Sequence, residues 1–133
     1  MSMSQDSMIT IDTLNEHVGE EKLRATVAAF YSRVKTDPLI GKMYPQDDWA
    51  GSEKRLADFI VYRFGGPQTY LQERGHPRLR MRHLPFSIGL AERDQWLKLM
   101  GEAMRETSIS EEAAEVMIPF FAQVADMMRN RPE

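Results

Sequence analysis

The sequence predicts an all-α domain, and three observations support this prediction. Apolar residues recur at helical spacing along most of the chain, and no segment shows the alternation of a half-buried strand. The length of 133 residues suits a single domain. Apolar residues make up 42% and charged residues 28%, so the chain can bury a core and is not expected to be disordered.

The first half of the chain contains two expected helices before a turn. A short helix over about residues 12–18 ends at Gly19, and a longer helix covers about residues 20–36. Asp37-Pro38 ends the longer helix, because the residue before proline is disfavoured in helical geometry. Its apolar stripe consists of Leu23, Val27, Phe30, Tyr31 and Val34.

A third helix is expected after the turn at residues 44–48, whose aspartates are suited to cap it. Gly65-Gly66-Pro67 should end this helix with a left-handed cap followed by a residue that cannot continue it. The face predicted to be buried carries Ser52, Leu56, Phe59, Ile60 and Phe64.

Residues 68–89 are irregular, and a long loop in so small a domain is often functional. A helix resumes near Ala91, with Glu92 and Asp94 at its positive end. Its stripe is Trp96, Leu97, Met100 and Met104. Ser108-Ile-Ser-Glu111 resembles a capping box before a last helix over about residues 111–129, which Pro119 should kink. The expected buried face of that helix carries Ala114, Met117, Ile118, Phe121, Val124, Ala125 and Met128.

The composition excludes several classes of protein. With no cysteine, disulfides, thiolate metal sites and cysteine nucleophiles are ruled out, and a reducing cytoplasm is expected. No apolar run approaches the roughly 18 residues that span a bilayer. Residues 1–8 contain no basic residue, so we expect a disordered tail in place of a secretory signal, followed by one domain over residues 9–131. The net charge of −3 does not favour nucleic acid.

Three kinds of side chain are candidates for chemistry. His83 lies among apolar residues, where an imidazole needs a partner, and it is either a satisfied core histidine or a ligand. His17 and His76 are expected at the surface. The segment 74–83 concentrates arginines beside His83, which makes either a solvated loop or a site for a small dianion. These arginines are Arg74, Arg78, Arg80 and Arg82.

Tyr31, Tyr44 and Trp96 place polar tips on otherwise apolar segments. Each needs a hydrogen-bond acceptor when buried, either a backbone carbonyl or a bound polar ligand on which all three converge. No hydrolase or phosphate-loop pattern is present, and no HExxH-like spacing supports a zinc site built from His83 with Asp47 or Asp48.

The run from Arg74 to Phe86 resembles the truncated haemoglobins, specifically their second group. Gly65-Gly66-Pro67 before it and residues 92–96 after it extend the resemblance, as do the pairs Phe30-Tyr31, Tyr44-Pro45 and Arg55-Leu56. The resemblance covers about residues 14–130 and implies a globin-like, two-over-two helical sandwich around haem b. Only Gly19 remains of the glycine pair that the family often carries between its first two helices.

The resemblance also implies roles for individual residues. His83 matches the proximal iron ligand, and Ser52 lies at the position where many globins place a distal histidine. Tyr31, Tyr44 and Trp96 match the positions that stabilise the bound gas. The propionates would be held by Arg55, Tyr70, Arg78 and Arg82, with Arg55 and Arg82 first. The porphyrin would be lined by Leu56, Phe59, Ile60, Phe64, Met81, Phe86, Leu90 and Met100.

The expected function is tight binding and slow release of dioxygen, with NO and CO as other ligands. Tight binding argues against simple oxygen delivery and favours NO dioxygenation or peroxide chemistry, both of which need an unidentified reductase. We expect a monomer or homodimer that binds neither nucleic acid nor membrane. The alternative is a helical regulator without a cofactor, in which His83 belongs to the core and the 74–83 loop binds an anionic partner.

Overall fold

The computed structural model describes residues 8–66 and 88–129, and in these two ranges every regular element is a helix. The short elements are η1 (Ile11–Thr13), α2 (Leu14–Val18) and η2 (Gly41–Met43). The long helices are α3 (Glu20–Val34), α4 (Trp49–Arg63), α7 (Leu90–Glu106) and α8 (Glu111–Met127). The predicted all-α class and the helix at about residues 20–36 are therefore confirmed.

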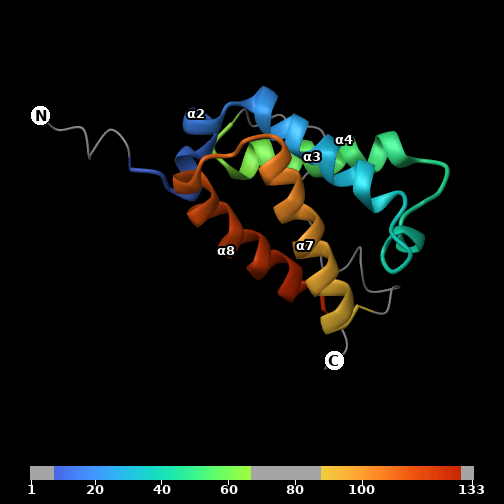
Figure 1. The fold of residues 1–133 in the computed structure, drawn as a ribbon. Coiled ribbons are helices and arrows are strands. Elements are labelled where there is room, and N and C mark those ends of the chain that lie inside the picture. The colour runs from blue at the N-terminus through green and yellow to red at the C-terminus, as the bar shows by residue number, and fades with distance from the viewer. Residues whose placement is uncertain (1–7, 67–87, 130–133) are drawn as a thin grey trace, which may run out of the picture.

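The four long helices form two pairs that lie across each other (Figure 1). Helices α3 and α4 run side by side in opposite directions, and α7 and α8 form the second pair. Helix α3 contacts both α4 and α7, so it joins the two layers. This is the two-over-two arrangement that the resemblance implied.

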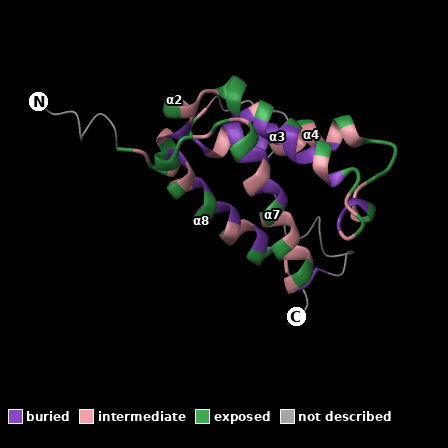
Figure 2. Ribbon diagram, in the orientation of Figure 1, coloured by how far each residue is buried: buried purple, intermediate pink, exposed green. Residues whose placement is uncertain are grey.

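The core lies where the two pairs face each other, as the buried segments in Figure 2 show. All five residues of the predicted α3 stripe are buried, and Phe30 and Val34 are 0% exposed. Phe30 meets the Trp96 ring of α7 edge-on at 5.0 Å between centroids, which closes the contact between the layers.

Helix α4 ends as the sequence predicts. Gly65 has φ +91° and donates its N–H to the Tyr62 carbonyl, while Gly66 donates to the Val61 carbonyl over 2.8 Å. These two bonds form a Schellman cap. A Cβ at Gly65 would overlap the carbonyl oxygen of Asp12, so glycine also permits the close approach of the N-terminal segment.

Three local predictions were wrong, and each has a physical reason. Asp48 occupies the N-cap position of α4 without a side-chain cap, because its carboxylate pairs with Arg55. Ser110, and not Ser108, caps α8 by accepting the Ala113 N–H at 3.1 Å. Ser108 instead takes the left-handed turn before it, with φ +59°. The buried face of α8 is rotated, because Ile118 is 52% exposed while Phe120 is buried.

The described helices include none that is both long and apolar enough to span a membrane. Among the same residues, no group of three or more histidine and carboxylate side chains is placed to hold a metal ion.

Candidate functional site

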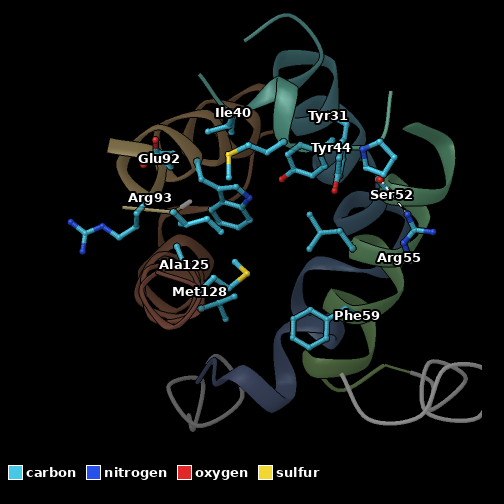
Figure 3. A pocket seen from close by; sticks show the side chains of 16 residues that line it. Tyr31, Ile40, Tyr44, Ser52, Arg55, Phe59, Glu92, Arg93, Ala125 and Met128 are labelled. Carbon is cyan, nitrogen blue, oxygen red and sulfur yellow. Dashed lines mark hydrogen bonds between the residues drawn. The ribbon is translucent and has the colours of Figure 1, made fainter. Parts of the chain in front are cut away.

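A cavity of about 320 Å³ opens between the two helix pairs (Figure 3). Its wall is mainly apolar, and its polar members are two tyrosine hydroxyls, an indole, a serine and three charged side chains. A largely apolar cavity with a few convergent polar groups is the usual form of a small-molecule site. The lining residues are Tyr31, Ile40, Met43, Tyr44, Pro45, Ser52, Arg55, Leu56, Phe59, Ile88, Glu92, Arg93, Trp96, Val124, Ala125 and Met128.

The structure brings together Tyr31, Tyr44 and Trp96 from three different segments of the chain. Tyr31 comes from α3, Tyr44 follows η2, and Trp96 comes from the second turn of α7. The Tyr31 hydroxyl and the Trp96 indole lie beside the Tyr44 hydroxyl, and their influence as donors lowers the pKa of Tyr44 against the effect of burial. With donors on these two sides, the Tyr44 hydroxyl is suited to direct its own proton at a molecule in the cavity.

The segment that carries Tyr44 is tied down at both ends. Asp37 accepts the backbone N–H groups of Leu39 and Ile40 at 3.0 and 2.9 Å, and its second oxygen accepts the Gln95 side chain at 2.6 Å. Gln95 immediately precedes Trp96 on α7. At the other end, Gln46 donates to the Tyr44 carbonyl at 2.8 Å. These contacts fix the position of Tyr44 relative to Trp96.

Burial keeps both tyrosines protonated. Desolvation by burial is the main cause that raises the pKa of Tyr44 to about 12, against the two donors that lower it. Burial, followed by the charge of Tyr44, raises the pKa of Tyr31 further. Both hydroxyls therefore remain hydrogen-bond donors throughout the neutral and moderately alkaline range.

We expect the free energy of unfolding to fall steeply above pH 10. The unfolded tyrosines ionise near their ordinary pKa of about 10, while the folded ones hold their protons, so each costs up to about 1.4 kcal/mol per pH unit until its folded pKa is passed. For Tyr44 that window closes at about pH 12. Urea unfolding of the wild type and of Tyr31→Phe between about pH 8 and about pH 11 measures the effect. Identical pH slopes of the unfolding free energy in the two proteins would contradict it, since the variant retains only Tyr44 of these two cavity tyrosines.

Ser52 and Arg55 lie on the α4 side of the cavity. Ser52 is buried, and its hydroxyl accepts an Arg55 N–H at 3.3 Å. The same guanidinium donates to Asp48 at 3.2 Å, and its head points out of the cavity in Figure 3. Because Asp48 is exposed and the ion pair is solvated, Arg55 can exchange this partner for another carboxylate at the rim.

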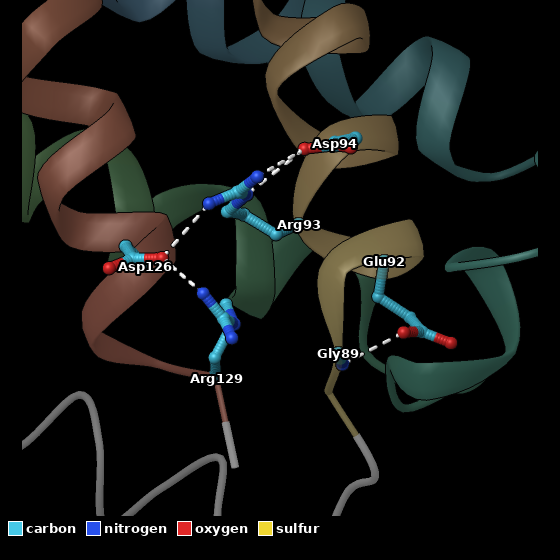
Figure 4. A network of polar contacts seen from close by, with 6 residues as sticks. All are labelled: Gly89, Glu92, Arg93, Asp94, Asp126 and Arg129. Carbon is cyan, nitrogen blue, oxygen red and sulfur yellow. Dashed lines mark hydrogen bonds and ion pairs between the residues drawn. The ribbon is translucent and has the colours of Figure 1, made fainter. Parts of the chain in front are cut away.

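Helices α7 and α8 form the opposite rim, and a polar network joins them (Figure 4). Asp126 receives hydrogen bonds from Arg129 at 2.8 Å and from Arg93 at 3.0 Å, and these bonds lower the pKa of its carboxyl. Arg93 also pairs with Asp94 at 2.9 Å. Glu92 caps the helix by accepting the Gly89 N–H at 2.8 Å. This network fixes the end of α8 beside the start of α7.

The remaining predicted site residues fall into two groups. Leu56 and Phe59 line the cavity, as do Ser52 and Arg55. Ile60, Phe64 and Met100 are at most 2% exposed and belong to the core, and Leu90 is the half-buried first residue of α7. None of these last four is among the described residues that line the cavity. The predicted residues that lie outside the described ranges are Tyr70, Arg78, Met81, Arg82, His83 and Phe86.

Sequence reasoning missed part of the lining. Ile40, Met43, Ile88 and Arg93 were not assigned to it. The first three lie in or beside the short 3-10 helix η2 or just before α7, where no α-helical stripe marks them, and Arg93 lies on α7 outside its predicted stripe. Val124, Ala125 and Met128 were expected to be buried, and the structure shows that they also face the cavity. Trp49, also missed, stacks on Tyr44 behind the wall.

Residues 13–130 match the bacterial-like globin family, so the chain is a globin. It is 37% identical over 118 residues to the group 2 truncated hemoglobin YjbI of Bacillus subtilis (strain 168), with 89% of each chain covered. Two solved structures share the fold. The hemoglobin of Chloroflexus aurantiacus has TM-score 0.85 and 43% identity over 90% of this chain and 98% of that one. The truncated oxygen-avid haemoglobin of Bacillus subtilis has TM-score 0.83 and 36% identity, over 89% of this chain and 99% of that one.

Within the globins, these relatives place the chain in the second group of truncated haemoglobins, as the sequence resemblance indicated. Membership of the family implies a haem cofactor. The described residues fit such a group, because the cavity offers an apolar wall for a porphyrin and an arginine at its rim for a propionate.

Proposed function

We propose that this protein binds dioxygen, and also NO and CO, at a haem b iron ligated by His83, and that it releases dioxygen slowly. The observation that carries this proposal is the convergence of three donors on the cavity wall, namely the buried Tyr31 and the partly buried Tyr44 and Trp96. The B. subtilis relative is described as oxygen-avid, which supports the proposal of tight dioxygen binding.

Haem, when bound, would supply an iron centre that can bind a diatomic molecule. The chain itself supplies the polar wall beside it. A diatomic ligand that gains negative charge on binding is stabilised by fixed donors in a site with little water. Tyr44 is the donor that we place nearest the ligand, because Tyr31 and Trp96 lie beside its hydroxyl as donors.

Arg55 is the proposed partner of one haem propionate. It lies at the rim of the cavity and now pairs with the exposed Asp48, which a propionate would replace. Tyr70, Arg78 and Arg82 remain proposed for the same role, with Met81, Phe86 and Leu90 for contact with the porphyrin. Ile60, Phe64 and Met100 would then support the wall from the core.

Slow release favours chemistry on the bound ligand over oxygen delivery. NO dioxygenation and peroxide reduction are the two reactions that we propose, and each needs an electron donor from outside the chain, such as a separate reductase. Ser52 gives the cavity a small side chain on the α4 side, so no histidine from that position governs the ligand.

The experiment that tests this proposal is haem titration of the purified protein followed by its visible absorption spectrum. We expect stoichiometric uptake, and a Soret band that shifts reversibly when the reduced protein meets dioxygen. Failure to take up haem would discard the proposal. It would direct attention to the alternative, a regulator whose 74–83 loop binds an anionic partner.

A further inference from the structure

Trp49 lies directly behind the polar wall of the cavity. It is the half-buried first residue of α4 and is not among the described residues that line the cavity. Its indole stacks on the Tyr44 ring, with 5.7 Å between centroids and 27° between planes. It also meets Tyr31 edge-on at 6.4 Å, and Tyr31 lies 5.5 Å from Tyr44. All three separations are those of rings in contact.

These contacts make a continuous aromatic path from the cavity to the surface. Tyr44 faces the cavity on one side and Trp49 on the other, so a single ring contact separates Trp49 from the cavity wall. The two ends differ in how they handle a proton. The Tyr44 hydroxyl lies beside Tyr31 and Trp96 in the cavity wall, whereas the partly exposed Trp49 can release its N–H proton to water.

We propose that Trp49 is a surface site at which small phenols deliver single electrons to a peroxide that is reduced in the cavity. The inference rests on the proposed haem function and gives it a class of reducing substrate. Haem, when bound, would supply the redox chemistry that reduces peroxide.

The reaction balances with hydrogen peroxide and two phenol molecules. Each phenol loses one electron and its hydroxyl proton and leaves as a phenoxyl radical. Peroxide gains the two electrons and two protons, its O–O bond breaks, and two water molecules form. Trp49 loses an electron to the cavity, releases its N–H proton, and recovers both from the next phenol, so it is unchanged after each turnover.

The surroundings of Trp49 favour uncharged phenols. Asp47 and Asp48 precede it directly and are exposed, and Arg55 pairs with only one of them. The remaining negative charge repels anionic donors such as carboxylated phenols and leaves neutral ones unaffected.

The test compares haem-loaded wild type with Trp49→Phe, using guaiacol as the phenol and hydrogen peroxide as the oxidant. Tyr62→Phe, an aromatic change near the other end of α4, is the matched control. We expect Trp49→Phe to slow guaiacol oxidation about tenfold, equal to about 1.4 kcal/mol in the barrier, while the control stays at the wild-type rate. Haem uptake and the dioxygen release rate should be unchanged in both variants.

A second readout does not depend on turnover. Without guaiacol, peroxide should leave oxidation products on the peptide that contains Trp49, and mass spectrometry should find this only in the haem-loaded protein. Equal oxidation in the haem-free protein, or an unchanged guaiacol rate in Trp49→Phe, would overturn the relay alone. A wild type that takes up no haem would overturn the proposed function and the relay together.

Discussion

Replacing His83 by alanine is expected to abolish stable haem binding while leaving a helical protein of reduced stability. Loss of an outer-shell partner of a metal ligand already weakens binding roughly ten- to a hundredfold, so loss of the ligand itself should exceed that range. The protein should lose the free energy that haem binding adds to its folded state. Haem titration by absorption and far-UV circular dichroism measure the two effects separately.

The control for His83→Ala is His17→Ala. His17 is exposed in the last turn of α2, so its loss should change neither haem binding nor the fold. The ligand assignment fails if His83→Ala retains the spectrum of a histidine-ligated ferrous haem. It also fails if His17→Ala loses that spectrum.

The double variant Tyr31→Phe/Trp96→Phe is expected to release dioxygen at least tenfold faster than the wild type. Each net hydrogen bond contributes about 0.5–1.5 kcal/mol, and a factor of ten corresponds to about 1.4 kcal/mol. Both changes remove a donor from the cavity wall and also leave the Tyr44 hydroxyl without the groups that orient it. Stopped-flow displacement of dioxygen by CO measures the rate.

Trp49→Phe is the matched control for the double variant, because it alters a ring that contacts both tyrosines without changing a donor in the cavity wall. Its release rate should equal that of the wild type. An unchanged rate in the double variant would show that donors other than Tyr31 and Trp96 hold the ligand. Equal acceleration in both proteins would assign the effect to ring packing.

The helices were predictable because their signals are local. The stripe of α3 and the Schellman cap of α4 each depend on residues within a few turns of one another, and both are confirmed. The cap of α8 was misassigned because Ser108 has a glutamate three residues later, the spacing of a capping box, whereas Ser110 is followed at that spacing by Ala113. Only the folded backbone shows that Ser110 accepts the Ala113 N–H.

Site residues were predictable only where the motifs of the family resemblance or the apolar stripe of a helix included them. Tyr31, Tyr44 and Trp96 were candidates because they place polar tips on apolar segments, the resemblance gave them a role, and the structure places them together. Met43 and Ile40 entered the wall because the segment after α3 folds back across it, which no spacing in the sequence encodes. Ile118 and Phe120 were misassigned because one step along a helix turns a side chain by about 100°.

The bond between Asp37 and Gln95 has a consequence for the thermodynamics of ligand capture. Because this contact of 2.6 Å ties the segment bearing Tyr44 to the helix bearing Trp96, the donors are already ordered before a gas molecule enters. Binding then requires little loss of conformational entropy from the protein. The favourable interaction of the donors with the ligand is therefore retained almost entirely as affinity.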